Sequence, residues 1–225
     1  LLSAVGIATA VLCTYLLISI FGSRSMFPSI LSIAFLFIIA WRYHMFVLGM
    51  TPFLGSVFSF TTLLIAITSA VKAFNYITTL WKGNLQMNPG MLFSIGLVST
   101  FITGGLTGII LGDSTLDINV HDTYFVVAHF HLVMGISALY GLFAGVYHWF
   151  PKMFNRMMNK NLGYVHFWLT AIGSYGVFFP MHFVGMAGLP RRYYTNTNFP
   201  YFDDLADTNK LITYFAIATA FAQLF

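Results

Sequence analysis

The sequence predicts an all-α protein, a polytopic bundle of transmembrane helices. Of its 225 residues, 58% are hydrophobic and only 7% are charged. A soluble domain carries about 25% charged residues, so this chain cannot cover a water-exposed surface. Its apolar stretches are mostly near the roughly 20 residues that a helix needs to cross a bilayer. Because no repeat, low-complexity segment or long polar linker separates the stretches, we expect residues 1–225 to form a single membrane domain.

The apolar stretches predict the following helices in chain order. We expect spans at residues 1–20, 26–39 with an extension to 41, 52–80, 89–111, 124–150 and 163–186, and the start of another near 209. Pro28 stands where a helix can begin. Both ends of the chain lie within apolar runs, and residue 1 is not Met, so we expect an internal piece of a longer membrane protein.

The loops between these spans alternate in charge. Basic residues without acids occupy the loops near 21–28, 81–88 and 151–161, whereas all six acids are Asp and lie at 113–122 and 203–207. Basic loops stay on the cytoplasmic side, so the acidic loops are expected outside. This distribution explains the pI near 9.2 without nucleic acid. The single cysteine, Cys13, excludes an internal disulfide and a thiolate cluster.

Two histidines at the start of the predicted span 124–150 carry the strongest signal of chemistry. His129 and His131 are two positions apart, and each helical residue turns the chain by about 100°. Their side chains therefore point to nearly opposite faces and are unsuited to one shared metal ion. Each can bind a separate large cofactor, with Phe130 between them. Imidazole is a common axial ligand of haem iron, which suggests electron transfer between two haems.

Polar residues near the same outer surface fit the edges of such cofactors. Arg191 and Arg192 form a basic pair on the acidic side, and guanidinium binds carboxylates such as haem propionates bidentately; the alternative is interfacial snorkelling. Asp117 can accept a hydrogen bond from a propionate or share its proton. His121 and Asp122 can bind Mg²⁺, although Asp122 can also be only a helix cap.

Two further residues have less certain roles. His44, at the outer end of the second span, matches His129 in depth and can reach a metal facing it. Lys72 lies in the middle of the third span, where a charge costs at least about 2.5–3.5 kcal/mol. Thr68 and Ser69, one turn earlier, offer hydroxyl groups, so this helix is a candidate proton path. We expect the remaining three histidines, His148, His166 and His182, to be structural.

The segment His-Asp-Thr-Tyr-Phe-Val-Val-Ala-His-Phe-His at 121–131 closely resembles the signature of subunit I of the haem–copper oxidases. Further matches occur in the family's order: Gly-Gly-Leu-Thr-Gly at 104–108, Leu-Asp-Ile at 116–118, His-Trp-Phe-Pro at 148–151, Phe-Phe-Pro at 178–180 and Leu-Pro-Arg-Arg-Tyr at 189–193. The chain resembles the C-terminal half of a bacterial cytochrome c oxidase subunit I. The resemblance covers the end of the family's sixth helix to part of its twelfth.

The resemblance implies a role for each candidate residue. It makes His129 the ligand of a high-spin haem, His131 a ligand of a low-spin haem and His44 a copper ligand. It makes His121 and Asp122 part of a magnesium site. The haem propionates would be bound by Asp117, Arg191 and Arg192, and a proton path would include Lys72 and Ser69. The cofactors implied are two haems, of the a type, copper and Mg²⁺. The partners implied are oxidase subunits II and III, cytochrome c, the missing N-terminal half of subunit I and the lipid bilayer.

The sequence departs from the family at the copper site. Where the family has an adjacent pair of histidines after a Trp, this chain reads Tyr43-His44, with Arg42 in place of a small residue. We therefore expect the chain alone to be inactive. The implied activity is O₂ reduction with electrons from cytochrome c and proton translocation, in a bacterial plasma membrane or a mitochondrial inner membrane. The alternatives are a quinol oxidase, a nitric-oxide reductase, an inactive remnant or a secondary transporter.

Overall fold

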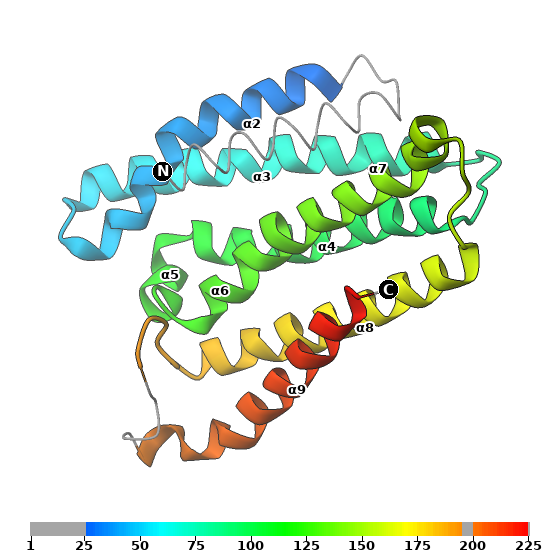
Figure 1. Cartoon of the computed structure of the whole chain (residues 1–225). Coiled ribbons are helices and arrows are strands. Elements are labelled where there is room, and N and C mark those ends of the chain that lie inside the picture. Colours follow the sequence, from blue (N-terminus) through cyan, green and yellow to red (C-terminus); the bar gives the residue numbers. More distant parts are fainter. Residues whose placement is uncertain (1–25, 195–199, 225) are drawn as a thin grey trace.

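The computed structural model describes residues 26–194 and 200–224, and in these residues the regular structure is helical (Figure 1). The elements are α2 (Met26–Ala40), η1 (Trp41–Leu48), α3 (Pro52–Leu80), α4 (Pro89–Gly112), α5 (Ser114–Val120), α6 (Tyr124–Phe130), η2 (His131–Ile136), α7 (Ser137–Phe154), α8 (Lys160–Met186), η3 (Pro200–Leu205) and α9 (Ala206–Ala222). The predicted span at 1–20 and Arg24 lie outside the described residues. The predicted all-α class is confirmed.

Five of these helical stretches are long and apolar enough to cross a membrane: Phe27–Leu48, Pro52–Leu80, Pro89–Gly112, Tyr124–Phe154 and Lys160–Met186. The third predicted span is confirmed at both ends, and the fourth differs by one residue. The prediction for the second span was too short. Its polar and aromatic stretch at 41–44 interrupts the apolar run, yet the chain continues as 3₁₀ turns until Gly49, whose φ of 103° ends the helix.

The core lies where α4 packs against α7 and α8. Phe93 on α4 and Tyr140 on α7 are fully buried, and their ring centroids lie 5.6 Å apart. Phe167 on α8 meets Phe93 edge-on at 5.2 Å. Many large apolar side chains elsewhere are exposed, among them Phe53 and Phe60 on α3. A helix that is apolar on its outer face suits a lipid environment, because lipid requires no polar covering.

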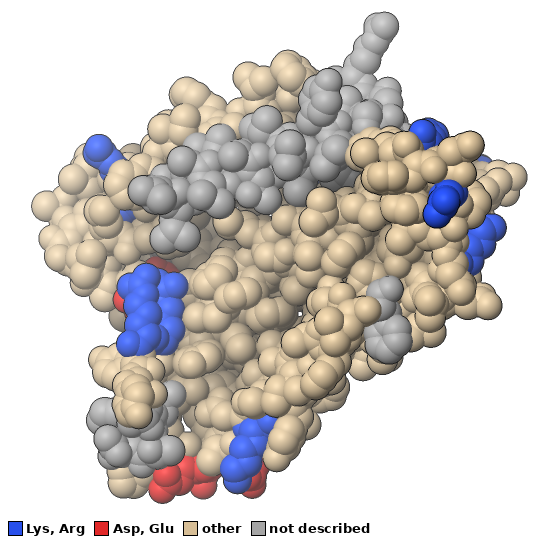
Figure 2. Space-filling view, in the orientation of Figure 1, with Lys and Arg blue, Asp and Glu red and all other residues tan. Residues whose placement is uncertain are grey.

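The loops gather at the two ends of the bundle. At one end, the Tyr164 hydroxyl of α8 donates to the carbonyl of Met87 in the α3–α4 loop at 2.8 Å. At the other end, an isolated β-bridge joins Thr123 to Pro190, and the Tyr124 amide donates to Leu189. Charged side chains lie mainly at these ends in Figure 2, while the flank is largely uncharged. In the described residues, the predicted basic loops at 81–88 and 151–161 lie at one end of the bundle and the predicted acidic loops at the other. Arg24, the basic residue of the first loop, is outside these residues.

Candidate functional site

His129, at the end of α6, is held by α4. Its Nδ1 lies 2.8 Å from the carbonyl oxygen of Gly104 and 3.1 Å from the Thr107 hydroxyl. Since a carbonyl can only accept, Nδ1 carries the proton and donates, and Nε2 keeps its lone pair. Gly108 makes this approach possible, because a Cβ there would lie 2.8 Å from Cε1 of the ring. This is the arrangement typical of metal-binding histidines.

His131 is held from a different side. Its Nδ1 donates to the carbonyl of Val127 at 2.8 Å, which leaves Nε2 with its lone pair. Its ring stacks on Phe178 of α8, with centroids 4.9 Å apart and planes 13° apart. His129 thus contacts α4, whereas His131 contacts α8. The expectation that the two rings point to different faces is confirmed, and Phe130 lies between them in sequence and contacts the His131 ring at 4.4 Å.

A π-helical turn, η2, starts at His131 and was not predicted from the sequence. The Ser137 hydroxyl donates to the carbonyl of Leu132, five residues earlier, at 2.7 Å, and lies 3.0 Å from the Thr100 hydroxyl of α4. Such wide turns often occur at functional sites. The signal in the sequence was a single serine in an apolar run, which does not distinguish a π-turn from an α-helix.

Asp122 is the anionic partner of Arg191. Its Oδ1 accepts a hydrogen bond of 2.7 Å from Arg191 Nε, and Arg192 Nη1 lies 4.0 Å away. The alternative role of Asp122 as a helix cap was wrong. A φ of 54° at Asp122 turns its side chain toward the loop, and Thr123 caps α6 instead by accepting from the Phe125 amide. Partial burial raises the pKa of Asp122, but the hydrogen bond and charge of Arg191, with smaller contributions from His121 and Arg192, lower it overall.

His121 lies between two carboxylates. Its Nδ1 is 3.6 Å from Asp117 and its Nε2 is 3.9 Å from Asp122. Asp117 is 3% exposed, so this carboxylate is buried beside the imidazole. Across residues 26–194 and 200–224, no group of three or more His, Cys, Asp or Glu side chains is arranged to hold a metal ion.

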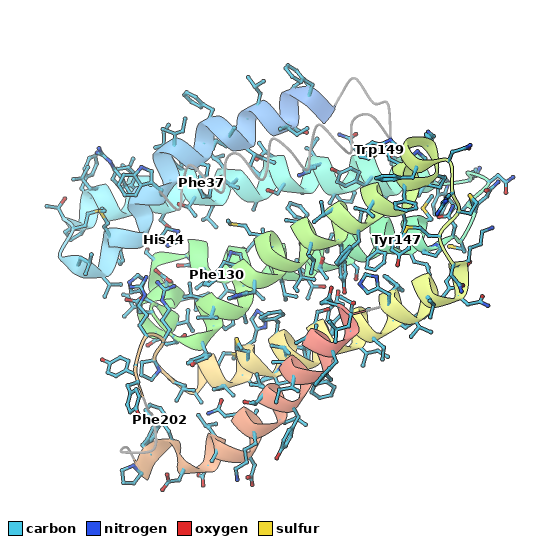
Figure 3. The ribbon with its side chains drawn as sticks, in the orientation of Figure 1. Phe37, His44, Phe130, Tyr147, Trp149 and Phe202 are labelled. Atoms are coloured by element: carbon cyan, nitrogen blue, oxygen red, sulfur yellow. The ribbon has the colours of Figure 1, made fainter. Side chains whose placement is uncertain are left out.

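His44 lies at the end of the bundle that carries α5 and the start of α6 (Figure 3). Its electrostatic neighbours are His121, Asp122 and Arg191. That His44 and His129 lie at similar depth stays a prediction. Its neighbour Tyr43 has a backbone in η1, and its side chain is outside the described part of the structure.

Lys72 points to α4 from the middle of α3. Its Nζ lies 5.0 Å from the centroid of the Phe101 ring, a cation–π contact. Ser69 is half-buried on the preceding turn, and the Thr68 hydroxyl donates to the carbonyl of Ile65.

The other histidines have distinct surroundings. His148 is exposed and lies 3.4 Å from Lys152, whereas His166 is buried and pairs with the Tyr147 hydroxyl at 3.0 Å. His182 is 7% exposed and donates from Nδ1 to the Phe178 carbonyl, on the residue that stacks against His131.

Comparisons with known proteins identify the family. The family described as "Cytochrome C and Quinol oxidase polypeptide I" matches residues 1–224. The chain is 43% identical over 224 residues to the alternative cytochrome c oxidase subunit 1 of Bradyrhizobium diazoefficiens, covering 99% of this chain and 38% of that protein. The chain belongs to this oxidase family. It is also 45% identical to cytochrome c oxidase subunit 1 of Thermostichus vulcanus, over 83% of this chain and 34% of the relative.

A solved structure of a heme-copper terminal oxidase dimer has the same fold. It matches with a TM-score of 0.74 at 21% identity, over 88% of this chain and 40% of the solved chain. The resemblance to haem–copper oxidase subunit I is therefore confirmed, and the chain is an integral membrane protein of an oxidoreductase family. It spans between about a third and two-fifths of the length of the curated relatives it matches.

Proposed function

We propose that this chain is part of the catalytic subunit of a terminal respiratory oxidase, which reduces O₂ to water with electrons from cytochrome c and translocates protons. The observation that carries the proposal is the pair His129 and His131. Each ring donates from Nδ1 to a backbone carbonyl, and so keeps Nε2 free to coordinate iron. The two rings contact different helices, α4 and α8, which suits two separate haems.

The surroundings of both rings fit a haem. The Nδ1 bonds orient the rings and raise the basicity of Nε2. Gly135, one turn after His131, is exposed, and an added Cβ there would meet only the His131 side chain, 3.6 Å from Cδ2 and 4.0 Å from Cβ. A flat macrocycle can approach the helix closely at such a position. When bound, haem iron supplies electron transfer and oxygen binding, and we propose His129 for the high-spin haem and His131 for the low-spin haem, both of the a type, with Phe130 between them.

The propionates would be held by Asp117, Arg191 and Arg192. Arg191 binds Asp122 tightly, so its charge is partly neutralised. Arg192 is 69% exposed and only 4.0 Å from the same oxygen, so its guanidinium has donors for a second carboxylate. Buried Asp117 fits a site that shares a proton with a propionate, because an ionised carboxylate beside another anion is unfavourable.

The metal sites would be completed by other chains. We propose His44 as a copper ligand, with further ligands from the N-terminal half of subunit I. Asp122 and His121 fit a Mg²⁺ site only through the second oxygen of Asp122, since Arg191 occupies Oδ1. From the family resemblance we propose subunits II and III as partners, and we propose that the fragment alone is inactive. The bacterial relatives favour a bacterial plasma membrane over a mitochondrial inner membrane.

Lys72 and Ser69 would carry protons toward the site. The Phe101 ring stabilises the cationic form of Lys72 within the span. A cationic lysine within a membrane helix raises the free energy of insertion unless its ammonium group faces a polar path or a charge partner. The role of Ser69 follows from its position one turn earlier, on a nearby face of α3.

The test uses membranes of a strain without its own terminal oxidases, carrying this chain with its natural subunits. Oxygen uptake is measured with reduced cytochrome c and with a quinol, and nitric oxide consumption is measured separately. We expect cytochrome c-dependent uptake that is lost in His129→Ala and His131→Ala and kept in His148→Ala, whose side chain is exposed and remote from both haem ligands. Uptake that survives both substitutions, or nitric oxide consumption without O₂ uptake, would overturn the proposal.

A further inference from the structure

The loop between α7 and α8 contains a pocket that the oxidase chemistry does not use. It has a volume of about 340 Å³ and is lined by Tyr147, Phe150, Arg156, Met158, Asn159 and Leu162, among others. We call it the loop pocket. It lies at the end of the bundle opposite to the candidate haem ligands, where the chain passes from α7 to α8 through residues 155–159.

The walls of the loop pocket combine one cation with apolar surface. Arg156 is exposed and has no acidic partner among the described residues. The oxygen of Asn159 accepts from the amides of Asn161 and Leu162, so its amide nitrogen is left as a donor. Phe150, Met158 and Leu162 supply the apolar side. A pocket of this kind matches a polar headgroup attached to hydrocarbon.

The charge at this end of the bundle is entirely positive. Lys82 and Arg156 lie in its loops, Lys152 lies in the last turn of α7 and Lys160 is the first residue of α8. The chain has no Asp or Glu between Asp122 and Asp203 or before Asp113. The α3–α4 loop, which contains Lys82, is bound to α8 by a hydrogen bond from the Tyr164 hydroxyl to the carbonyl of Met87 in that loop. This end of the bundle therefore presents cations without a nearby carboxylate of the same chain, which favours anionic ligands over cationic ones.

An apolar track leads from the loop pocket along the bundle. On α8, Leu162, Val165, Leu169 and Ile172 follow one another at helical spacing and are all exposed. Met157, which also lines the pocket, and Met153 on the last turn of α7 are each 72% exposed. Exposed apolar side chains in line with a basic pocket provide a surface for acyl chains below a headgroup.

We propose that the loop pocket binds an anionic phospholipid of the cytoplasmic leaflet, with its phosphate at Arg156 and its acyl chains along the exposed face of α8. Guanidinium forms bidentate hydrogen bonds with phosphate oxygens. Basic pockets between membrane helices on this side of a bilayer are suited to anionic headgroups. A zwitterionic phospholipid has the same phosphate, but its ammonium group would lie near Arg156, at an end of the bundle whose loops carry no acid.

The experiment measures lipid binding to the purified complex that contains this chain, by native mass spectrometry. Phosphatidylglycerol and phosphatidylcholine with the same acyl chains are compared, and inorganic phosphate is added as a competitor. We expect tighter binding of phosphatidylglycerol, weakened about five-fold by Arg156→Gln, since one cation near the surface contributes that much. Inorganic phosphate should compete only weakly, because it lacks acyl chains.

Three variants separate a pocket from diffuse attraction. Lys210→Gln removes the same charge at the opposite end, where Lys210 pairs with Asp207, and should leave phosphatidylglycerol binding unchanged. Met158→Trp and Leu162→Trp fill the loop pocket without a change in charge and should each weaken binding. The thermal unfolding midpoint checks that the two Trp variants fold. If they do not fold, Arg156→Gln still tests the proposal, because Arg156 is at an exposed position. Equal binding of both lipids, equal loss in Arg156→Gln and Lys210→Gln, or unchanged binding in folded Trp variants would overturn the proposal.

Discussion

The Nδ1 atom of His129 lies 2.8 Å from the carbonyl oxygen of Gly104, which precedes it by 25 residues on α4. The bond depends on a close approach of two helices. A Cβ at Gly104 would lie 2.6 Å from Cγ2 of Val133 and 2.9 Å from Cβ of Leu132. The glycine therefore sets the distance between α4 and the segment that starts at His129, and with it the orientation of the imidazole.

Gly104→Ala should push α4 away from this segment and weaken the His129 bond. Overpacking of this kind costs about 1–3 kcal/mol. Gly105→Ala is the matched control, because its Cβ would meet nothing within 4 Å, and alanine favours a helix over glycine. Thermal unfolding and haem content of the purified complex measure both. Equal stability and haem content in the two variants would contradict the close approach at Gly104.

Ser137→Ala should destabilise the π-turn that begins at His131. The variant loses the hydroxyl bonds to Leu132 and Thr100, and a buried hydrogen bond contributes about 1 kcal/mol. We expect a lower unfolding midpoint and a shifted absorption band of the haem assigned to His131. Ser56→Ala is the control, because Ser56 is exposed and its hydroxyl donates to the Pro52 carbonyl in its own helix. If the absorption band shifted in neither variant, the π-turn would have no influence on the haem assigned to His131, which would contradict this prediction.

The pair of Asp122 and Arg191 should make stability depend on pH on the acid side. The pKa of Asp122 is lowered in the folded protein, so its contribution is complete above the ordinary pKa of about 3.9 and is lost as pH falls through the lower folded value. The loss should stay below about 1 kcal/mol, because the carboxylate is half-exposed and screened by solvent.

Unfolding midpoints recorded between acid and neutral pH check this dependence. Asp122→Asn should lower stability at neutral pH and flatten the acid-side decrease, while Asp204→Asn, at an exposed position, should follow the unmodified chain. If the decrease in Asp122→Asn matched that of the unmodified chain, another group would be responsible.

Lys72→Met should slow turnover of the assembled oxidase if α3 carries protons. The substituted side chain is one atom shorter, remains unbranched and carries no charge or transferable proton. Positioned proton transfer contributes at least about 10²-fold. Lys82→Met removes a charge from the α3–α4 loop, outside the span, and should leave turnover near normal. Oxygen uptake at several pH values measures the effect. Normal turnover of Lys72→Met would exclude this lysine from the proton path.

The sequence was sufficient for the helices and for the divergence of the two histidines. Long apolar runs define spans in a bilayer, and a turn of about 100° per residue separates His129 from His131. The contact of the His129 ring with α4 and of the His131 ring with α8 agrees with this angular separation. The family signature added the roles, which a spacing of two residues cannot assign by itself.

Other features depended on tertiary contacts. Asp122 precedes Thr123, and either residue can cap a helix; the choice follows from the backbone turn that brings Asp122 to Arg191, 69 residues later. The π-turn depends on a bond between Ser137 and Thr100 on another helix. The helical extension from Trp41 to Leu48 packs Phe46 against Gly55, a contact that hydropathy does not detect.

The most direct measurement is the absorption and electron paramagnetic resonance spectrum of the assembled complex with His131→Ala and with His129→Ala. The two imidazoles serve different irons in this account. His131→Ala should therefore remove the low-spin signal and keep the high-spin signal, and His129→Ala should do the reverse. Loss of both signals together in either folded variant, or of neither, would contradict it.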